Sequence, residues 1–234
     1  MSVIQTRIFW GEMSKKLIIW DFDGVIADTE KMWLQNRMVQ LNEKFALNWD
    51  LEKTNRLLGG MSDKTKRLEL QKLGINTDDV FWKEAADIDF KVLSKGFALT
   101  PGIEDIFKIS NFEQCIATGG TRSKTEQKID IVGIKKYFPM NKVFTADMVK
   151  YGKPEPDLFL LAAKTMGFDV KDCIVVEDSI AGLTAALRAK ITPIAFIGSD
   201  LYDKKTYKNK INDMGVNLVF DNMNDVKKAI LSLT

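Results

Sequence analysis

The chain has 234 residues, of which 45% are hydrophobic and 28% are charged, ordinary values for a globular protein with room for a sizeable core. A net charge of +2 gives no reason to expect binding to nucleic acid or to an anionic membrane, and no apolar run approaches the roughly 20 residues needed to span a bilayer. The absence of histidine removes Ser-His and Cys-His catalysis and histidine-ligated zinc, which leaves carboxylates, lysine, hydroxyls and the backbone.

The two cysteines, Cys115 and Cys173, lie in apolar runs, which favours buried, reduced thiols over a disulfide or a metal site. With few thiols and no imidazole, any metal should be a hard cation with oxygen ligands, Mg²⁺ before Zn²⁺. Residues 1–13 form an N-terminal extension of unknown role. They lack a long apolar segment with a small-residue cleavage site, so we expect a cytoplasmic protein.

The first predicted strand is the apolar run at residues 17–20, which opens directly onto Asp21, Asp23 and Gly24. A buried parallel strand has this pattern when its carboxyl end becomes a reaction site. Of two nearby carboxylates, one can act as a nucleophile while the other transfers the proton, because the environment separates their pKa values. An aspartate nucleophile replaces one difficult displacement by two easier ones. A simple turn is the alternative, since Asp-Gly pairs are common turn formers.

Residues 29–97 show only helical periodicity, and strand signals return at residues 98–102. We therefore expect a helical cap domain at 29–97, inserted into a core domain made of residues 14–28 and 98–234. The cap should be mobile, with hinges near residues 28–30 and 98–102.

From residue 102 onward, predicted helices alternate with short apolar runs. Helices are expected at 103–110, 123–132, 157–166, 179–189 and 225–233. Strands are expected at 114–117, 142–145, 173–176, 193–197 and, more weakly, 217–220. This order predicts an α/β protein with a doubly wound parallel sheet and helices on both faces.

Three further groups of polar residues follow predicted strands. Thr118 and Gly119 offer a hydroxyl and exposed N–H groups suited to phosphate oxygens, although Thr118 could equally be a helix cap. Lys153, held between glycine and proline, is a candidate for neutralising phosphate charge. Glu177 and Asp178 end an apolar strand and suit a Mg²⁺ site, or Asp178 is only an acid at a helix start.

In this order the motifs resemble those of the haloacid dehalogenase superfamily of phosphohydrolases, over nearly the whole chain from residue 16. The matching residues are Asp21-Phe22-Asp23-Gly24, Thr118, Lys153 and Glu177-Asp178. The resemblance implies a Rossmann-like core with an inserted helical cap. The motif pattern of the dehalogenases in this superfamily lacks the second aspartate and the acids that bind the metal. The presence of Asp23 and Asp178 therefore favours phosphoryl transfer.

The resemblance also implies the role of each residue. Asp21 is the nucleophile and a Mg²⁺ ligand, and Asp23 is the acid and base, with its backbone carbonyl on the metal. Lys153 contacts the phosphate and the nucleophile, and its bond to Pro154 is expected to be cis. The remaining residues are Thr118 and the Gly119 N–H on the phosphate, and Asp178 with Glu177 on Mg²⁺.

Among the members of the superfamily that carry a cap, the chain looks most like the bacterial sugar-phosphate and 6-phosphogluconate phosphatases, and next like the β-phosphoglucomutases. Three segments carry this resemblance: residues 137–139, 153–157 and 176–179. The mutases carry a cap histidine where this chain has Trp33 and a phosphate-binding arginine near Ser62. Both departures favour hydrolysis.

We therefore expect a Mg²⁺-dependent phosphatase acting on a sugar phosphate or sugar-acid phosphate through an aspartyl phosphate, with a phosphosugar mutase as the alternative. A signalling receiver domain also uses a strand-end aspartate, but it needs neither a large cap nor Asp23. The expected partner is a small phosphorylated metabolite, with no nucleic acid and no membrane, and the expected state is a monomer. Candidate specificity residues are Trp33, Arg56 and Gly59. Four basic side chains of the cap either bind an anionic leaving group or are simply solvated: Arg56, Lys64, Lys66 and Arg67.

Overall fold

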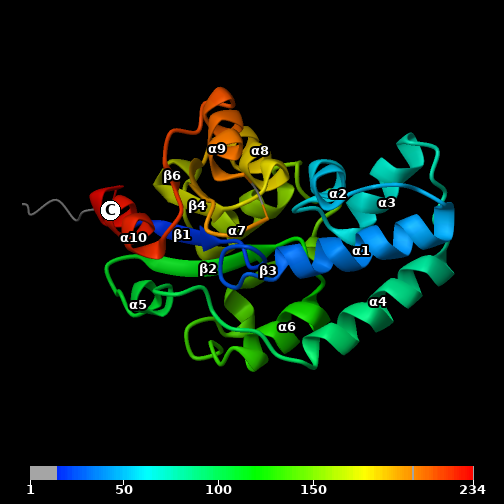
Figure 1. Cartoon of the computed structure of the whole chain (residues 1–234). Helices are drawn as coiled ribbons and strands as arrows, with labels where there is room; N and C mark the ends of the chain where they lie inside the picture. The colour runs from blue at the N-terminus through cyan, green and yellow to red at the C-terminus, as the bar shows by residue number, and fades with distance from the viewer. Residues whose placement is uncertain (1–14, 202, 234) are drawn as a thin grey trace, which may run out of the picture.

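A computed structural model describes residues 15–201 and 203–233, so the expected extension at 1–13 lies outside the described residues. Six strands form one sheet in the order β3-β2-β1-β4-β5-β6, and every pairing is parallel (Figure 1). The predicted fold class is confirmed. The strands are β1 (Leu17–Trp20), β2 (Glu113–Thr118), β3 (Val143–Thr145), β4 (Cys173–Glu177), β5 (Thr192–Phe196) and β6 (Val219–Phe220).

Strand β1 lies between β2 and β4, with Trp20 paired to both Ile116 and Val176. The segments that follow these three strands therefore leave the sheet at the same edge. The chain continues from β1 to β2 and β3 on one side and then crosses to β4 on the other side of β1. This edge is therefore the crevice where open α/β sheets bind ligands.

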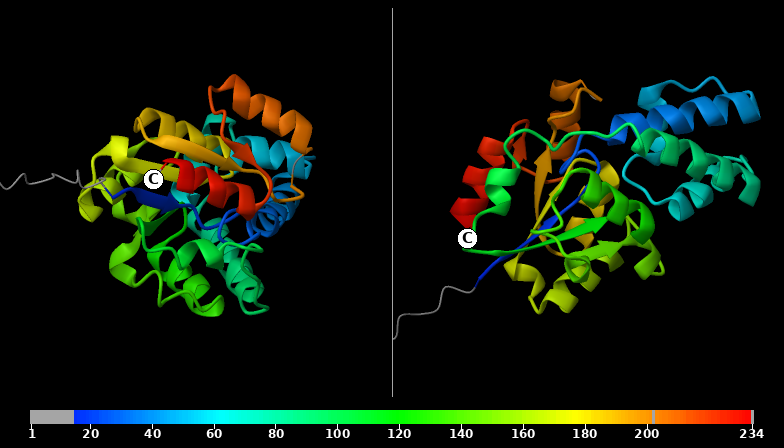
Figure 2. Two further views of the ribbon diagram at one scale, coloured as in Figure 1. Left: turned by 90° about the vertical axis from the view of Figure 1, so that its left-hand side faces the viewer. Right: turned by 90° about the horizontal axis from the view of Figure 1, so that it is seen from below.

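The two faces of the sheet bury alternate residues of β1. Ile18 and Trp20 pack with α5, α6 and α10, whereas Leu17 and Ile19 pack with α7 and α8 (Figure 2). Burial on both faces explains the continuous apolar run of β1. The core helices are α5 (Glu104–Phe107), α6 (Arg122–Ile131), α7 (Asp157–Met166), α8 (Ile180–Arg188), α9 (Lys204–Asp213) and α10 (Met223–Leu233).

Two local features differ from the sequence expectations. The helix expected at 103–110 ends at Phe107 in α5, where the buried Gln114 side chain donates to the Phe107 carbonyl at 3.2 Å and so satisfies a helix-end acceptor. Helix α9 was not anticipated, because Ile211 is its one buried residue within a polar sequence. Both cysteines are buried and unpaired, as expected.

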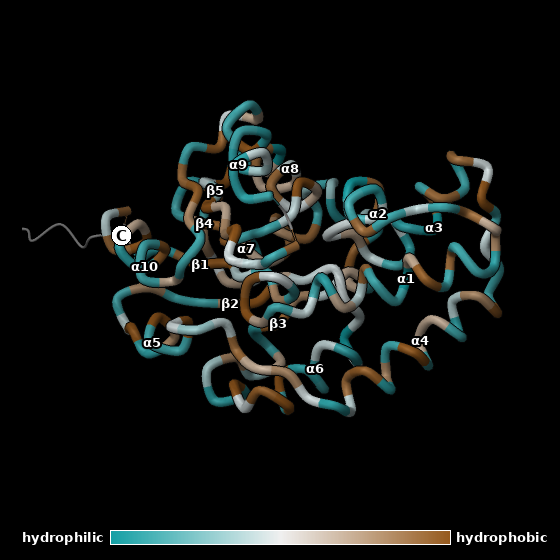
Figure 3. The backbone as a smooth tube through the Cα atoms, in the orientation of Figure 1, coloured by the Kyte–Doolittle hydropathy of each residue, from teal (hydrophilic) through white to brown (hydrophobic). Residues whose placement is uncertain are grey.

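The helical insertion, α1–α4, lies beyond the carboxyl ends of the strands (Figures 1 and 2). It has its own apolar cluster, which includes Leu34, Leu41 and Phe81. Along α4 the chain alternates between hydrophilic and hydrophobic residues, typical of a helix with one buried side (Figure 3). The helices are α1 (Glu30–Phe45), α2 (Leu51–Leu58), α3 (Asp63–Lys72) and α4 (Asp79–Leu93).

The two connections between the insertion and the sheet run side by side. Ala27 forms an antiparallel bridge with Leu99, and Thr100 donates its hydroxyl to the Val25 carbonyl at 2.7 Å. The insertion is thus fixed at its base within four residues of Asp23. Among the described helices, none is both long and apolar enough to cross a membrane.

Candidate active site

Asp21 is the first residue after β1 and shares a buried lysine with a second carboxylate. Lys153 Nζ donates to Asp21 Oδ1 at 2.5 Å and to Glu177 Oε1 at 2.6 Å. Burial raises the pKa of Asp21 to about 8, with Glu177 and Asp23 adding to the rise and Lys153 opposing it. Burial opposes the charge of Lys153, but the two carboxylates outweigh it and raise the pKa of the lysine. The ammonium therefore stays charged and only partly compensates the acids around it.

Lys153 and Glu177 are held in place by their own loops. The Lys153–Pro154 bond is cis, as the resemblance led us to expect, and the Lys153 ammonium lies 5.1 Å from the centre of the Phe159 ring. Glu177 accepts from the Ser179 backbone N–H at 2.7 Å and from its hydroxyl at 2.9 Å. Both charged groups are thereby preorganised around Asp21.

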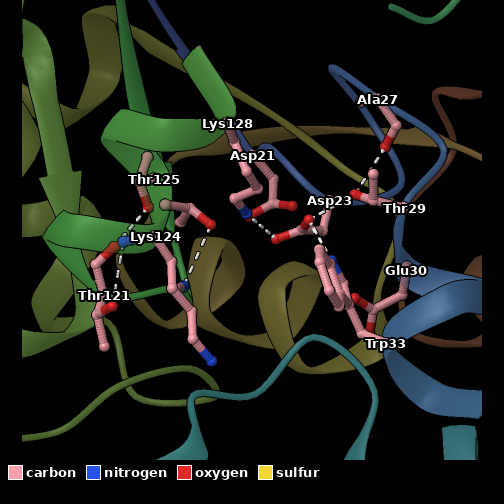
Figure 4. Close-up of polar contacts among 12 residues, drawn as sticks. Asp21, Asp23, Ala27, Thr29, Glu30, Trp33, Thr121, Lys124, Thr125 and Lys128 are labelled. Carbon is pink, nitrogen blue, oxygen red and sulfur yellow. Dashed lines mark hydrogen bonds and ion pairs between the residues drawn. The ribbon is translucent and has the colours of Figure 1, made fainter. Parts of the chain in front are cut away.

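Asp23 accepts three hydrogen bonds, from the residue before α1, from α1 itself and from α6 (Figure 4). Thr29 donates at 2.5 Å and the Trp33 indole at 2.6 Å to Oδ1, while Lys128 Nζ donates at 2.6 Å to Oδ2. Burial opposes ionisation of Asp23, but the charge of Lys128 and these hydrogen bonds outweigh it and lower the pKa of the carboxyl. Asp23 is therefore ionised in this arrangement.

Asp178 approaches the same loop because position 24 has no side chain. Gly24 has φ 85°, and a Cβ there would overlap the Asp178 carboxylate. Asp178 is buried, and its backbone carbonyl accepts from the Tyr207 hydroxyl at 2.8 Å. The glycine after the two aspartates thus serves both the backbone conformation and the close approach of the third acid.

Replacing Gly24 by alanine should move Asp178 and lower activity by at least about tenfold, since one displaced group of a preorganised site costs on this scale. The left-handed backbone should add about 1–2 kcal/mol of instability. Steady-state kinetics and thermal melting would check both effects. Gly74→Ala is the matched control, because Gly74 also has positive φ but a Cβ there meets no atom within 4 Å. Equal activity losses in the two variants would contradict the role of Gly24.

Thr118 ends β2 and Gly119 follows it, and both face the helical insertion across a cavity of about 190 Å³. Asp21, Asp23 and these two residues line its core side, and Trp33 lines its opposite side. The insertion comes close here, since a Cβ on Gly119 would lie 3.3 Å from the Gly60 carbonyl oxygen. The cavity is therefore bounded by the sheet edge and by the insertion together.

The structure brings most of the predicted site residues together. Trp33 reaches Asp23, but Arg56 is exposed and neither it nor Gly59 is among the residues that line the cavity. Sequence reasoning missed Lys128, although it shares the buried side of α6 with Thr125 and Ile129, a pattern that could have revealed it. The predicted residues that converge are Asp21, Asp23, Trp33, Thr118, Gly119, Lys153, Glu177 and Asp178.

The donor set around Asp21 suits a hard divalent cation. Within residues 15–201 and 203–233, no three acid, cysteine or histidine side chains converge as a preformed metal centre. The groups at hand are nevertheless all oxygen donors, from Asp21, Asp178 and the Asp23 backbone, and burial raises the pKa of Asp21, with the charges of Glu177 and Asp23 adding to the rise. Oxygen donors with unbalanced negative charge fit Mg²⁺ better than Zn²⁺.

An α/β sheet with an acidic site at its topological switch point and an inserted helical segment defines the class of this protein. Residues 18–196 match the model of the haloacid dehalogenase-like hydrolases, and the chain belongs to this family. The family that the sequence motifs resemble is thereby confirmed.

The chain is similar to two phosphatases of Escherichia coli. It is 29% identical to fructose-1-phosphate phosphatase YqaB, over 74% of this chain and 91% of that protein, and 24% identical to 6-phosphogluconate phosphatase, over 83% and 87%. The crystal structure of the haloacid dehalogenase-like protein ATU0790 from Agrobacterium tumefaciens matches with a TM-score of 0.77 at 25% identity, over 94% and 99%. The family and these relatives identify an enzyme of the phosphoric monoester hydrolase class.

Proposed function

We propose that this protein is a Mg²⁺-dependent phosphatase that hydrolyses a small sugar phosphate or sugar-acid phosphate through an aspartyl phosphate on Asp21. The observation that carries the proposal is the position of Asp21, which lies at the end of the central strand, contacts Lys153 and lines the cavity shared with Thr118. The phosphatases among the relatives support the substrate class.

The first step is attack by Asp21 on phosphorus. Lys153 holds Oδ1, which leaves Oδ2 to form the new P–O bond as the ester P–O bond breaks and the alcohol departs. Thr118 and the Gly119 N–H bind the phosphate oxygens, and Lys153 offsets their charge. Water then attacks the aspartyl phosphate, which releases phosphate and regenerates Asp21.

Asp23 handles the proton in both steps. Its ionised form, favoured by Lys128, Thr29 and Trp33, accepts the proton of the attacking water. The protonated form donates to the leaving alcohol. Of the three contacts, the one with Trp33 comes from within a helix of the insertion, and it is lost when the insertion moves away.

Mg²⁺ would be held by the carboxylates of Asp21 and Asp178 and by the Asp23 backbone carbonyl, with Glu177 beside them. When bound, the cation supplies positive charge against the phosphate oxygens. The raised pKa of Asp21 supports this assignment. Burial raises it most and the charges of Glu177 and Asp23 add to the rise, so a nearby cation would stabilise the ionised carboxylate.

We further propose that residues 29–97 act as a mobile cap domain on a core made of residues 14–28 and 98–234. Contacts across the cavity support this, among them Lys64 Nζ to the Lys150 carbonyl at 2.7 Å and Lys124 Nζ to Asp89 at 2.7 Å. These two contacts are polar and can be exchanged for contacts with water, whereas Leu201 of the core also packs against the apolar cluster of the insertion. The proposed enzyme is a cytoplasmic monomer.

Trp33 bears on the choice between phosphatase and phosphosugar mutase. It stands where mutases of this pattern carry a histidine, and its indole N–H donates to Asp23. An indole can donate but cannot accept and return a proton, which favours hydrolysis. Assaying phosphate release against sugar-phosphate interconversion, with Mg²⁺ and a panel of sugar phosphates, tests the proposal. Interconversion without phosphate release would overturn it.

Asp23→Asn should lower kcat by about 10²–10⁴-fold for sugar phosphates, because an amide cannot protonate the leaving alcohol. The loss should be smaller for p-nitrophenyl phosphate, whose leaving group departs without a proton. Measuring kcat for both ester types in the variant and the parent enzyme checks this. Equal losses for good and poor leaving groups would argue against the acid role.

A further inference from the structure

Four charged side chains meet in the wall of the cavity. Arg37 lies on α1, Asp63 at the start of α3, Asp89 on α4 and Lys124 on α6, and all four line the cavity. We call these four residues the distal quartet. The first three belong to the insertion, so the part of a substrate that extends from the phosphate toward the insertion meets them.

The distal quartet is balanced, because each cation faces both carboxylates. Arg37 lies 3.7 Å from Asp63 and 3.7 Å from Asp89, and Lys124 lies 3.6 Å and 2.7 Å from the same two acids. Burial opposes ionisation of Asp63, but Lys66, Arg37 and Lys124 outweigh it and lower its pKa. Two cations and two anions within 4 Å of each other leave no net charge.

The other cations of the cavity wall are engaged as well. Lys66 lies 3.9 Å from Asp63 and its charge also acts on buried Glu30. Lys64 donates to a backbone carbonyl, and Lys128 donates to Asp23. Apart from the exposed Lys64, whose partner is an uncharged carbonyl, these cations already face carboxylates. A second anionic group on the substrate that reaches the distal quartet would therefore have to displace a carboxylate or lie beside Asp63 and Asp89, at a cost in repulsion.

Two buried atoms of the distal quartet nevertheless have no hydrogen-bond partner among the described residues: Arg37 Nε, a donor, and Asp89 Oδ1, an acceptor. The side chains are 4% and 8% exposed. Arg37 is fixed by Gln40 at 2.5 Å and by the Trp82 ring, whose centre is 5.0 Å away, so it cannot turn aside easily. Both atoms are covered in this arrangement, so a substrate hydroxyl, which donates and accepts, satisfies them only when the side chains around them move apart.

We propose that the substrate is the monophosphate of an uncharged polyol or sugar, whose hydroxyls bind the distal quartet, and that sugar-acid phosphates and bisphosphates are discriminated against. This rests on the proposed phosphatase function and narrows it: the phosphate is the only charged group that the cavity accepts. Specificity arises from repulsion by Asp63 and Asp89 as much as from hydrogen bonding.

A matched pair of substrates tests the proposal. Glucitol 6-phosphate and 6-phosphogluconate are linear six-carbon monophosphates that differ only at carbon 1, a hydroxymethyl group in the first and a carboxylate in the second. With Mg²⁺ present, kcat/KM should be at least tenfold higher for glucitol 6-phosphate. p-Nitrophenyl phosphate, which has no distal hydroxyls, serves as the reference for the phosphatase reaction itself.

Asp89→Asn removes one negative charge and should make Arg37 and Lys124 available to a carboxylate. The preference for glucitol 6-phosphate should then shrink by at least tenfold, chiefly through faster turnover of 6-phosphogluconate. Asp87→Asn is the matched control, the same change on the same helix at an exposed position outside the cavity, and should leave the preference unchanged. Asp63→Asn, at a less buried site, repeats the test if the Asp89 variant melts early.

The outcomes separate the inference from the function on which it rests. Hydrolysis of p-nitrophenyl phosphate with equal or better use of 6-phosphogluconate would overturn the inference alone. An unchanged preference in folded Asp89→Asn and Asp63→Asn proteins would do the same. No phosphate release from any of the three esters would overturn the proposed function and the inference together.

Discussion

Asp21→Asn should lower turnover by at least about 10⁴-fold, the scale on which removal of a covalent nucleophile acts. The amide has no anionic oxygen to attack phosphorus, and it weakens the site proposed for the cation. The fold should persist, because the amide keeps the shape of the side chain and its acceptor oxygen still faces Lys153. Phosphate release from a sugar phosphate and far-UV circular dichroism would measure the two effects.

Asp105→Asn is a suitable control, since Asp105 is exposed on α5 and its ion pair with Lys108 lies at the surface. It should leave turnover unchanged. Substantial phosphatase activity in purified, folded Asp21→Asn protein would sink the covalent mechanism.

Removal of the divalent cation should have the second largest effect. We expect a chelator to lower activity by at least about 100-fold, Mg²⁺ to restore it, and Ca²⁺ to inhibit. Ca²⁺ takes more oxygen ligands at longer distances than Mg²⁺, which should draw both oxygens of Asp21 away from attack. Titration of the metal-free enzyme with each cation measures this. Full activity with Ca²⁺ in place of Mg²⁺ would contradict the ligand assignment.

The pKa of Asp21 gives the same assignment a readout that does not depend on activity. Its ordinary value of 3.8 rises to about 8 in the metal-free fold, so the folded protein holds this proton more tightly than the unfolded chain. The stabilising contribution of the protonated group is present below pH 4 and is lost as pH rises toward 8. Mg²⁺ must displace the proton.

We therefore expect Mg²⁺ to raise the melting temperature more at pH 8.5 than at pH 5.5. The difference should vanish in Asp21→Asn, which has no proton to release. An identical shift at both pH values in the parent protein would contradict direct binding of the cation to Asp21.

The sheet could be predicted because its strands are buried on both faces and therefore read as short apolar runs, as at β1 and β4. Three site residues stand directly after such apolar runs: Asp21, Thr118 and Glu177. Because the strands are parallel, the sequence predicts that these side chains lie at one edge of the sheet. Lys153 was predictable only as a member of a recognisable motif, since its loop has no regular periodicity.

The rest of the site depends on contacts between elements far apart in the chain. Lys128 lies on a largely polar helix, where a lysine normally faces solvent, and only the packing of α6 against the sheet places it on Asp23. Arg37 and Asp89 likewise look like solvent-facing residues of helices, yet both are buried. Their burial is possible because opposite charges from different helices neutralise each other, a relation that local sequence does not record.

The aspartyl phosphate on Asp21 can be observed directly. The enzyme is mixed with Mg²⁺ and glucitol 6-phosphate, quenched in acid during turnover, reduced with borohydride and digested for mass spectrometry. An acyl phosphate is reduced to an alcohol, so residue 21 should be found as homoserine in the parent protein, and not in Asp21→Asn or without substrate. Steady release of phosphate with residue 21 unmodified, or with a different residue reduced in its place, would contradict the covalent mechanism.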